Sequence, residues 1–171
     1  LNELIAIEQI RRTKAIYWYA LDTKDWDRFE SVFTKDAVFD LRAEMLFANG
    51  QSFANLNLCP VDEAIAAGDP HVIIGARDFV SGAAQMIHDW ITVQHGHAPI
   101  IEIESEDVGR GIWPLFDCLQ KGDRTLMGYG HYHERYRRQS DGRWLISNWN
   151  LTRLRRDGEH PGWPDNFVPI E

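Results

Sequence analysis

The stretch Thr125–Arg138 (TLMGYGHYHERYRR) decides the fold, because the turn Ser140-Asp141-Gly142 joins it to a second run of the same kind, Arg143–Arg153 (RWLISNWNLTR). Both runs are rich in β-branched and aromatic residues, which is typical of strands. Two further runs, Pro99–Ser105 and Val108–Asp117, precede them through similar turn signals. Strands that follow one another through hairpins predict an antiparallel sheet.

The N-terminal third of the chain predicts helices rather than strands. Apolar residues recur at near-helical spacing from Asn2 to Leu21, which indicates a long amphipathic helix. The residues expected on its apolar face are Leu4, Ile7, Ile10, Ala15, Trp18 and Tyr19, and those expected in solvent are Glu3, Glu8, Arg11, Arg12 and Lys14. Asp25 is a suitable N-cap for a second, short helix.

The middle of the chain gives weaker signals. A short strand is expected at Ala37–Leu41, an irregular insertion at 42–74, and a helix from Phe79 to Trp90 with Asp78 as its cap. Helices followed by a run of hairpins predict an α+β domain in which helices cover one face of a curved sheet. We expect one domain over residues 1–156 and a C-terminal arm at 157–171.

Composition excludes several classes of protein. Among 171 residues, 26 Asp and Glu outnumber 18 Lys and Arg, and the net charge of −8 argues against a nucleic-acid or anionic-membrane partner. No stretch approaches the roughly 20 apolar residues of a spanning helix, and no signal segment is recognisable, so a cytoplasmic protein is expected. Cys59 and Cys118 stand apart and are expected to be reduced. The aromatic content of 12% suits either a large core or the walls of a small-molecule pocket.

Three short motifs carry a resemblance to a known family. They are LDTKDW (Leu21–Trp26), FTKDAVFD (Phe33–Asp40) and DGRWLI (Asp141–Ile146). Together they resemble the SnoaL-like branch of the nuclear-transport-factor-2-like superfamily. The resemblance implies a cone-shaped α+β barrel, an apolar cavity, and a homodimer or homotrimer, which we expect to form through the outer face of the sheet.

Two enzyme groups of that branch are similar in local sequence. Asp22–Trp26 resembles scytalone dehydratase, and His95–Pro99 with Gly109–Trp113 resembles bile-acid 7α-dehydratases. The latter resemblance implies catalytic roles for Tyr17, Asp22 and Arg153. The family's catalytic histidine falls on Gln94, so this chain departs from the pattern there.

The residues themselves suggest how that departure is met. Elimination next to an acidified C–H bond needs a base with a pKa near neutrality, and a histidine oriented by a carboxylate supplies one. His95 and His97 are the histidines nearest to Gln94, and a one-residue shift or bulge would turn one of them inward. We expect His95, or else His97, to pair with Asp22. Tyr17 would polarise a substrate oxygen.

Alternation along the last strands divides their residues between the two faces of the sheet. We expect Gly128, Gly130 and Tyr132 to face the cavity and His131 and His133 to face away. Asn148 shares the parity of the core residues Trp144 and Ile146, whereas Arg153 has the opposite parity and needs a bulge to turn inward. The residues expected to bind substrate are Trp18, Gln94, Trp113, Tyr132 and Asn148.

The sequence therefore predicts a lyase or isomerase, dehydratase-like and without a cofactor or bound metal, that acts on a small hydrophobic or polycyclic molecule. Two alternatives stay open. One is a domain that only binds a small ligand or only oligomerises. The other is a cupin-like metal enzyme, because His95, His97 and Glu102 have the spacing of a cupin metal motif.

Overall fold

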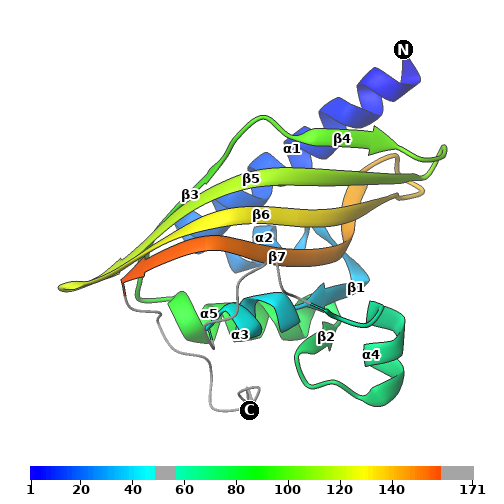
Figure 1. Ribbon diagram of the computed structural model, residues 1–171. Helices are drawn as coiled ribbons and strands as arrows, with labels where there is room; N and C mark the ends of the chain where they lie inside the picture. The colour runs from blue at the N-terminus through cyan, green and yellow to red at the C-terminus, as the bar shows by residue number, and fades with distance from the viewer. Residues whose placement is uncertain (49–56, 159–171) are drawn as a thin grey trace.

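The computed structural model describes residues 1–48 and 57–158, and its main feature is one curved sheet with the helices on one side (Figure 1). The strands are β1 (Phe33–Asp40), β2 (Val72–Ile74), β3 (Ile91–Gly96), β4 (Ile100–Ile103), β5 (Val108–Lys121), β6 (Arg124–Arg138) and β7 (Trp144–Gly158). Their order is β2-β1-β7-β6-β5-β3, and β4 also pairs with β5. The sheet does not close, so the predicted α+β fold is confirmed as an open, curved sheet rather than a complete barrel.

The long hairpins of the second half of the chain are confirmed. β5 pairs with β6 from Val108 opposite Arg137 to Lys121 opposite Arg124, and Gly122 at φ 60° makes the turn between them. One pair differs from the prediction, because β1 and β7 run parallel. These two strands lie at opposite ends of the chain, so no hairpin constrains their direction.

Two helices open the chain, α1 (Asn2–Thr23) and α2 (Trp26–Glu30), and the side chain of Asp25 caps α2 by accepting from the amide of Arg28 at 3.2 Å. The predicted apolar face of α1 is partly wrong. Lys14 is fully buried, whereas Leu4, Ala15 and Tyr19 are exposed. The reason is the true orientation of α1, in which Tyr17 faces the core and Lys14, one turn earlier, shares that face.

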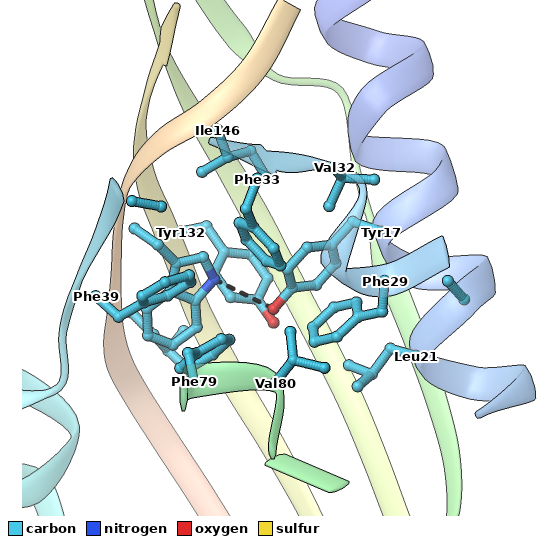
Figure 2. Packing of buried hydrophobic residues seen from close by; sticks show 14 of the residues in the cluster. Tyr17, Leu21, Phe29, Val32, Phe33, Phe39, Phe79, Val80, Tyr132 and Ile146 are labelled. Carbon is cyan, nitrogen blue, oxygen red and sulfur yellow. Dashed lines mark hydrogen bonds between the residues drawn. The ribbon is translucent and has the colours of Figure 1, made fainter. Parts of the chain in front are cut away.

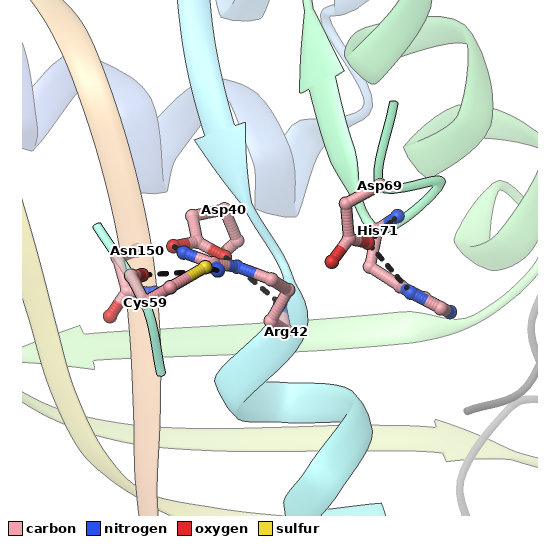
Figure 3. Close-up of polar contacts among 6 residues, drawn as sticks. All are labelled: Asp40, Arg42, Cys59, Asp69, His71 and Asn150. Carbon is pink, nitrogen blue, oxygen red and sulfur yellow. Dashed lines mark hydrogen bonds and ion pairs between the residues drawn. The ribbon is translucent and has the colours of Figure 1, made fainter. Parts of the chain in front are cut away.

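The segment predicted to be an irregular insertion contains two helices and a strand in its described part. α3 (Arg42–Ala48) follows β1 directly, α4 (Val61–Ala67) comes next, and β2 adds a strand beside β1. Arg42 is fixed by two hydrogen bonds to the carboxylate of Asp40 and one to the carbonyl of Cys59, while His71 Nδ1 lies 3.1 Å from Asp69 (Figure 3). Helices of seven residues are too short to show a helical period in the sequence.

The remaining helix, α5 (Ala76–Ile87), begins three residues earlier than its predicted start at Phe79. Its N-cap is Gly75 at φ 108°, so Asp78 lies inside the first turn and is not the cap. The C-terminal arm predicted at 157–171 begins as the end of β7, and its residues 159–171 lie outside the described part of the chain.

The core fills the space between the sheet, α1 and α5 and is dominated by aromatic rings (Figure 2). Phe39 of β1 and Phe79 of α5 stack with ring centroids 3.8 Å apart, and Phe33 meets Phe39 edge-on at 4.9 Å. Across the described residues, no helix is both long and apolar enough to span a membrane.

Candidate functional site

A pocket of about 110 Å³ lies where the sheet meets α1, α3 and α5. Its lining is mostly apolar and comes from helices and strands alike. The apolar lining includes Leu21, Phe29, Leu41, Ile73, Phe79 and Leu151. A mainly apolar pocket with a few convergent polar groups is the usual form of a small-molecule site.

The first group of polar side chains in the pocket is a pair of tyrosines. The hydroxyl of Tyr17 on α1 accepts from Trp149 Nε1 at 3.1 Å and lies beside the hydroxyl of Tyr132 on β6 (Figure 2). The Tyr132 hydroxyl in turn donates to Gln94 Oε1 at 3.3 Å. Figure 2 shows the hydroxyls of Tyr17 and Tyr132 pointing toward each other between α1 and the sheet.

Both tyrosines are protonated at neutral pH. Burial raises the pKa of Tyr17 and of Tyr132 well above the ordinary value, and hydrogen bonds only partly oppose this for Tyr17. A buried phenol that keeps its proton can donate a hydrogen bond to a ligand oxygen, or protonate it. The pair is therefore suited to polarise a carbonyl group.

The second polar group in the pocket is ionic. The Arg153 guanidinium holds both oxygens of Asp117, at 2.8 and 3.0 Å, and its Nε donates to Glu44 Oε2 at 2.9 Å. All three side chains are buried. Burial lowers the pKa of Arg153, but the charges of Glu44 and Asp117 outweigh it, so the pKa stays above the ordinary value.

Two backbone features make room for this ion pair. A bulge at Ser147 separates Ile146, which pairs with Tyr136, from Asn148, which pairs with Arg135, and so reverses the parity of β7 as far as Arg153, after which a second register shift follows. Arg153 consequently turns inward, as its predicted role requires. Gly128, which pairs with Asp117 between β5 and β6, leaves space, because a Cβ atom there would lie 2.1 Å from both Arg153 Nη1 and Asp117 Oδ1.

Four of the ten predicted site residues line the pocket together, namely Tyr17, Gln94, Tyr132 and Arg153. The parity expected for β6 is confirmed, because Tyr132 lies inside and His131 and His133 lie on the outer face. Sequence reasoning missed Asp117 and Glu44. Asp117 shares the inward parity of Trp113 and Leu115 on β5, which was a usable signal, whereas Glu44 lies in the segment predicted to be irregular.

Asp22 does not line the pocket. It is half-buried at the end of α1, where its Oδ2 accepts from the backbone amide of Gln94 at 3.0 Å. Its other oxygen is buried and finds no hydrogen-bond partner among the described residues. Burial raises the pKa of Asp22, although the bond from Gln94 opposes the shift. Asp22 thus fixes the strand that carries Gln94.

The expected inward turn of His95 or His97 is wrong. β3 pairs with β5 without a bulge, from Ile91 to Gly96, so Gln94 points into the pocket and His95 points outward. Both histidines are exposed. His95 is near enough for its charge to act on Asp22, but the hydrogen bond of Asp22 goes to Gln94 instead. Within residues 1–48 and 57–158, the structure therefore places no histidine in the pocket lining.

The other three predicted residues also lie outside the pocket lining. Trp18 packs edge-on against Trp113 at 5.5 Å, and Trp113 donates to the Tyr136 hydroxyl at 2.9 Å, so both rings belong to the core behind the pocket. The prediction for Asn148 is wrong because the bulge at Ser147 turns its side chain to the outer face.

The cupin-like alternative finds no support in the part of the chain that the structure describes. Glu102 is engaged by Arg110 at 2.6 Å, and no group of three His, Cys, Asp or Glu side chains within residues 1–48 and 57–158 is placed to hold a metal ion. The convergence of His95, His97 and Glu102 that this alternative requires is therefore not found there.

Comparisons with known proteins agree with this fold. A proposed scytalone dehydratase from Novosphingobium aromaticivorans DSM 12444 superimposes with a TM-score of 0.66 and 17% identity, over 93% of this chain and 91% of that one. Hexachlorocyclohexane dehydrochlorinase LinA-type3 from Novosphingobium barchaimii LL02 superimposes with a TM-score of 0.64 and 18% identity, over 99% of this chain and 98% of that one. Kfla4162 from Kribbella flavida superimposes with a TM-score of 0.70 and 16% identity, over 91% of this chain and 95% of that one. At these identities the likeness shows the fold alone.

The sequence also matches a family model directly. The model describes the SnoaL-like domain and matches residues 2–150, which is most of the chain. The resemblance drawn from the three short motifs is confirmed. The chain belongs to the family of SnoaL-like domain proteins.

Proposed function

We propose that this protein is a cofactor-free lyase or isomerase that acts by acid–base catalysis on a small, neutral, largely apolar molecule. One observation carries the proposal. Two protonated phenols, Tyr17 and Tyr132, line the same apolar pocket as the carboxylate of Asp117 and the guanidinium of Arg153. The structural neighbours named as a dehydratase and a dehydrochlorinase support a lyase reaction.

Dehydration of a β-hydroxy ketone illustrates the chemistry. Asp117 would take the proton from the carbon next to the carbonyl, while Tyr17 and Tyr132 donate hydrogen bonds to the carbonyl oxygen, on which negative charge develops. The electron pair of the broken C–H bond forms the C=C bond. The hydroxyl on the next carbon leaves with the proton from Asp117 as water, so the enzyme returns to its starting state.

Asp117 is preferred over Glu44 as the base because of its position. It pairs across the sheet with Gln94, whose amide oxygen holds the Tyr132 hydroxyl. The base on β5 thus lies on the strand next to that of Tyr132 on β6. Arg153 would stabilise the charge that develops during the reaction.

The size and charge of the pocket narrow the ligand. A cavity of about 150 Å³ accommodates benzene, so a pocket of about 110 Å³ is too small for a polycyclic molecule, and one small ring is its upper limit. Arg153 is already matched by Asp117 and Glu44, which leaves little attraction for an anionic ligand. A neutral ring with one acceptor oxygen fits these properties best.

Turnover of 3-hydroxycyclohexanone to cyclohex-2-enone tests the proposal, because the conjugated product absorbs in the ultraviolet. Wild-type protein should accelerate the reaction, and Asp117→Asn and Tyr132→Phe should each slow it by about 10²- to 10⁴-fold. Glu102→Gln, an exposed carboxylate on β4, is the control and should be fully active. Wild-type protein that gives no rate above that of buffer would contradict the proposal for this substrate class.

A second candidate is a binding protein without chemistry. Gln94 occupies the position at which the dehydratases that this sequence resembles have a histidine. In addition, both oxygens of Asp117 already accept hydrogen bonds from Arg153. Binding of cyclohex-2-enone without turnover of the hydroxy ketone would favour this candidate.

We also propose that the protein is a homodimer or homotrimer formed through the outer face of the sheet. Apolar side chains such as Ile91, Val93 and Met127 are exposed there, and Phe116 is half-buried. Light scattering after gel filtration tests this proposal, and a monomer at micromolar concentration would contradict it.

A further inference from the structure

A second ionic pair is buried directly behind the tyrosines of the pocket. Lys14 of α1 and Glu134 of β6 have no exposed side-chain surface, and Lys14 Nζ lies 2.6 Å from Glu134 Oε1. The other oxygen of Glu134 accepts from the hydroxyl of Tyr136, which itself accepts from Trp113 Nε1. Neither Lys14 nor Glu134 lines the pocket, and the proposed reaction uses neither.

The ammonium group of Lys14 also contacts the faces of two aromatic rings. Its Nζ lies 3.7 Å from the ring centroid of Tyr17 and 3.6 Å from that of Tyr132. These rings carry the hydroxyls that meet in the pocket. They stand edge to face, with centroids 5.7 Å apart and an angle of 67° between their planes.

The geometry accounts for every strong interaction of this cation. An ammonium group has three N–H donors. One is directed to Glu134, and three aromatic rings lie within cation–π distance, of which Tyr17 and Tyr132 are much nearer than Trp18 at 5.4 Å. A buried charge without such partners would be very unfavourable. The position of Lys14 therefore restricts both rings at once, and Glu134 restricts Lys14.

We propose that Lys14, held by Glu134, is a positioning residue that sets the orientation of Tyr17 and Tyr132 and thereby of their hydroxyls in the pocket. The inference rests on the proposed function only in taking these hydroxyls as the groups that meet the ligand. Lys14 acts through the two rings and does not itself touch the ligand.

The protonation of Lys14 offers a way to observe this coupling. Burial lowers the pKa of Lys14 to about 8, although the charge of Glu134 and its hydrogen bond oppose the shift. The titratable groups around it are Glu134, Tyr132 and Tyr136 on β6 and Tyr17 on α1. β5 contributes the uncharged indole of Trp113, which bonds Tyr136. Loss of the Lys14 proton should change the environment of both pocket tyrosines together.

The test uses ligand-free protein labelled with carbon-13 at the ζ carbon of tyrosine. The chain has five tyrosines, and Tyr→Phe variants assign their NMR signals. The key variant is Lys14→Met with Glu134→Gln, because removing both charges leaves no buried unpaired ion, whereas either single variant could fail to fold. The matched control is Arg110→Met with Glu102→Gln, an exposed ion pair of the same 2.6 Å length between β4 and β5.

We expect the signals of Tyr17 and Tyr132 to titrate with one shared midpoint near pH 8, and those of Tyr19 and Tyr129 to stay constant there. The double variant should shift the Tyr17 and Tyr132 signals and abolish their titration, and the control should do neither. Pocket tyrosines that show no common midpoint between pH 6 and 10, or signals that the double variant leaves unchanged, would overturn the inference. Because no ligand is present, failure of the proposed lyase reaction would not alter this result.

Discussion

The two buried ionic groups of this protein use the same chemistry in different settings. Arg153 of β7 joins Asp117 of β5 and Glu44 of α3 in the wall of the pocket, whereas Lys14 of α1 joins Glu134 of β6 behind that wall. The first group can meet a ligand directly, but the second reaches it only through the rings of Tyr17 and Tyr132. The comparison teaches that the role of a buried charge depends on what lies between it and the cavity.

The largest expected effect on stability comes from removing only one partner of the buried Lys14–Glu134 pair. Lys14→Met leaves the carboxylate of Glu134 buried without its cation, which typically costs about 3–5 kcal/mol of the free energy of unfolding. Adding Glu134→Gln should recover most of this loss, because the buried charge is then gone. Urea unfolding measures both variants. Equal stability of the single and double variants would show that Glu134 is not an uncompensated charge.

The buried pair of Lys14 and Glu134 should make the stability of the protein depend on pH. The pKa of Lys14 is about 8 in the folded protein and near 10.4 in an unfolded chain. Between these values the unfolded chain binds more protons, so the free energy of unfolding should rise with pH. At about 1.36 kcal/mol per pH unit, the rise from pH 8 to about 9.5 amounts to at most about 2 kcal/mol.

The pH range of this test ends at about 9.5, below the ordinary tyrosine pKa near 10. Above that pH, the raised pKa values of the buried tyrosines Tyr17 and Tyr132 lower the free energy of unfolding and so oppose the effect of Lys14. The control is the pH dependence of the free energy of unfolding of the double variant Lys14→Met with Glu134→Gln. If that variant showed the same rise as the wild type, Lys14 would not be its source.

A smaller effect is expected in the pocket group from Gly128→Ala. The added methyl would lie 2.1 Å from Arg153 Nη1 and Asp117 Oδ1, so the ion pair must shift. Overpacking of this kind typically costs about 1–3 kcal/mol. Gly82→Ala is the matched control: it lies within α5 with no atom within 4 Å of the new Cβ, and should stabilise by about 0.5–1 kcal/mol. Thermal or urea unfolding that ranks the two variants equally would refute this account of Gly128.

The smallest effects should follow changes on the outer face of the sheet. His95→Ala and His97→Ala remove exposed side chains, so each should change stability by less than about 0.5 kcal/mol. Neither should alter turnover of 3-hydroxycyclohexanone by more than about twofold. Loss of turnover in either variant would restore the histidine base that the sequence suggested.

Strand alternation predicted much of the site. The alternating pattern of β6 correctly places Tyr132 inside and His131 outside, and Glu134 follows the same parity, although sequence analysis did not use it. Lys14 could not be found in this way, because a lysine on an amphipathic helix normally marks the solvent side.

The position of Arg153 depends on a bulge at Ser147, and the residue types around Ser147 do not predict that bulge. Its partner Asp117 is 36 positions away in the chain and is reached only because Gly128 leaves space between them. Long-range contacts of this kind arise from tertiary packing, so no local sequence pattern predicts them.

The most direct test of the account is a crystal structure of the protein with cyclohex-2-enone bound. We predict that the ring occupies the apolar pocket and that its carbonyl oxygen lies within about 2.6–3.2 Å of the hydroxyls of Tyr17 and Tyr132. The carbon next to the carbonyl should then face Asp117. An enone bound on the outer face beside His95, or one whose oxygen points away from both tyrosines, would contradict the account.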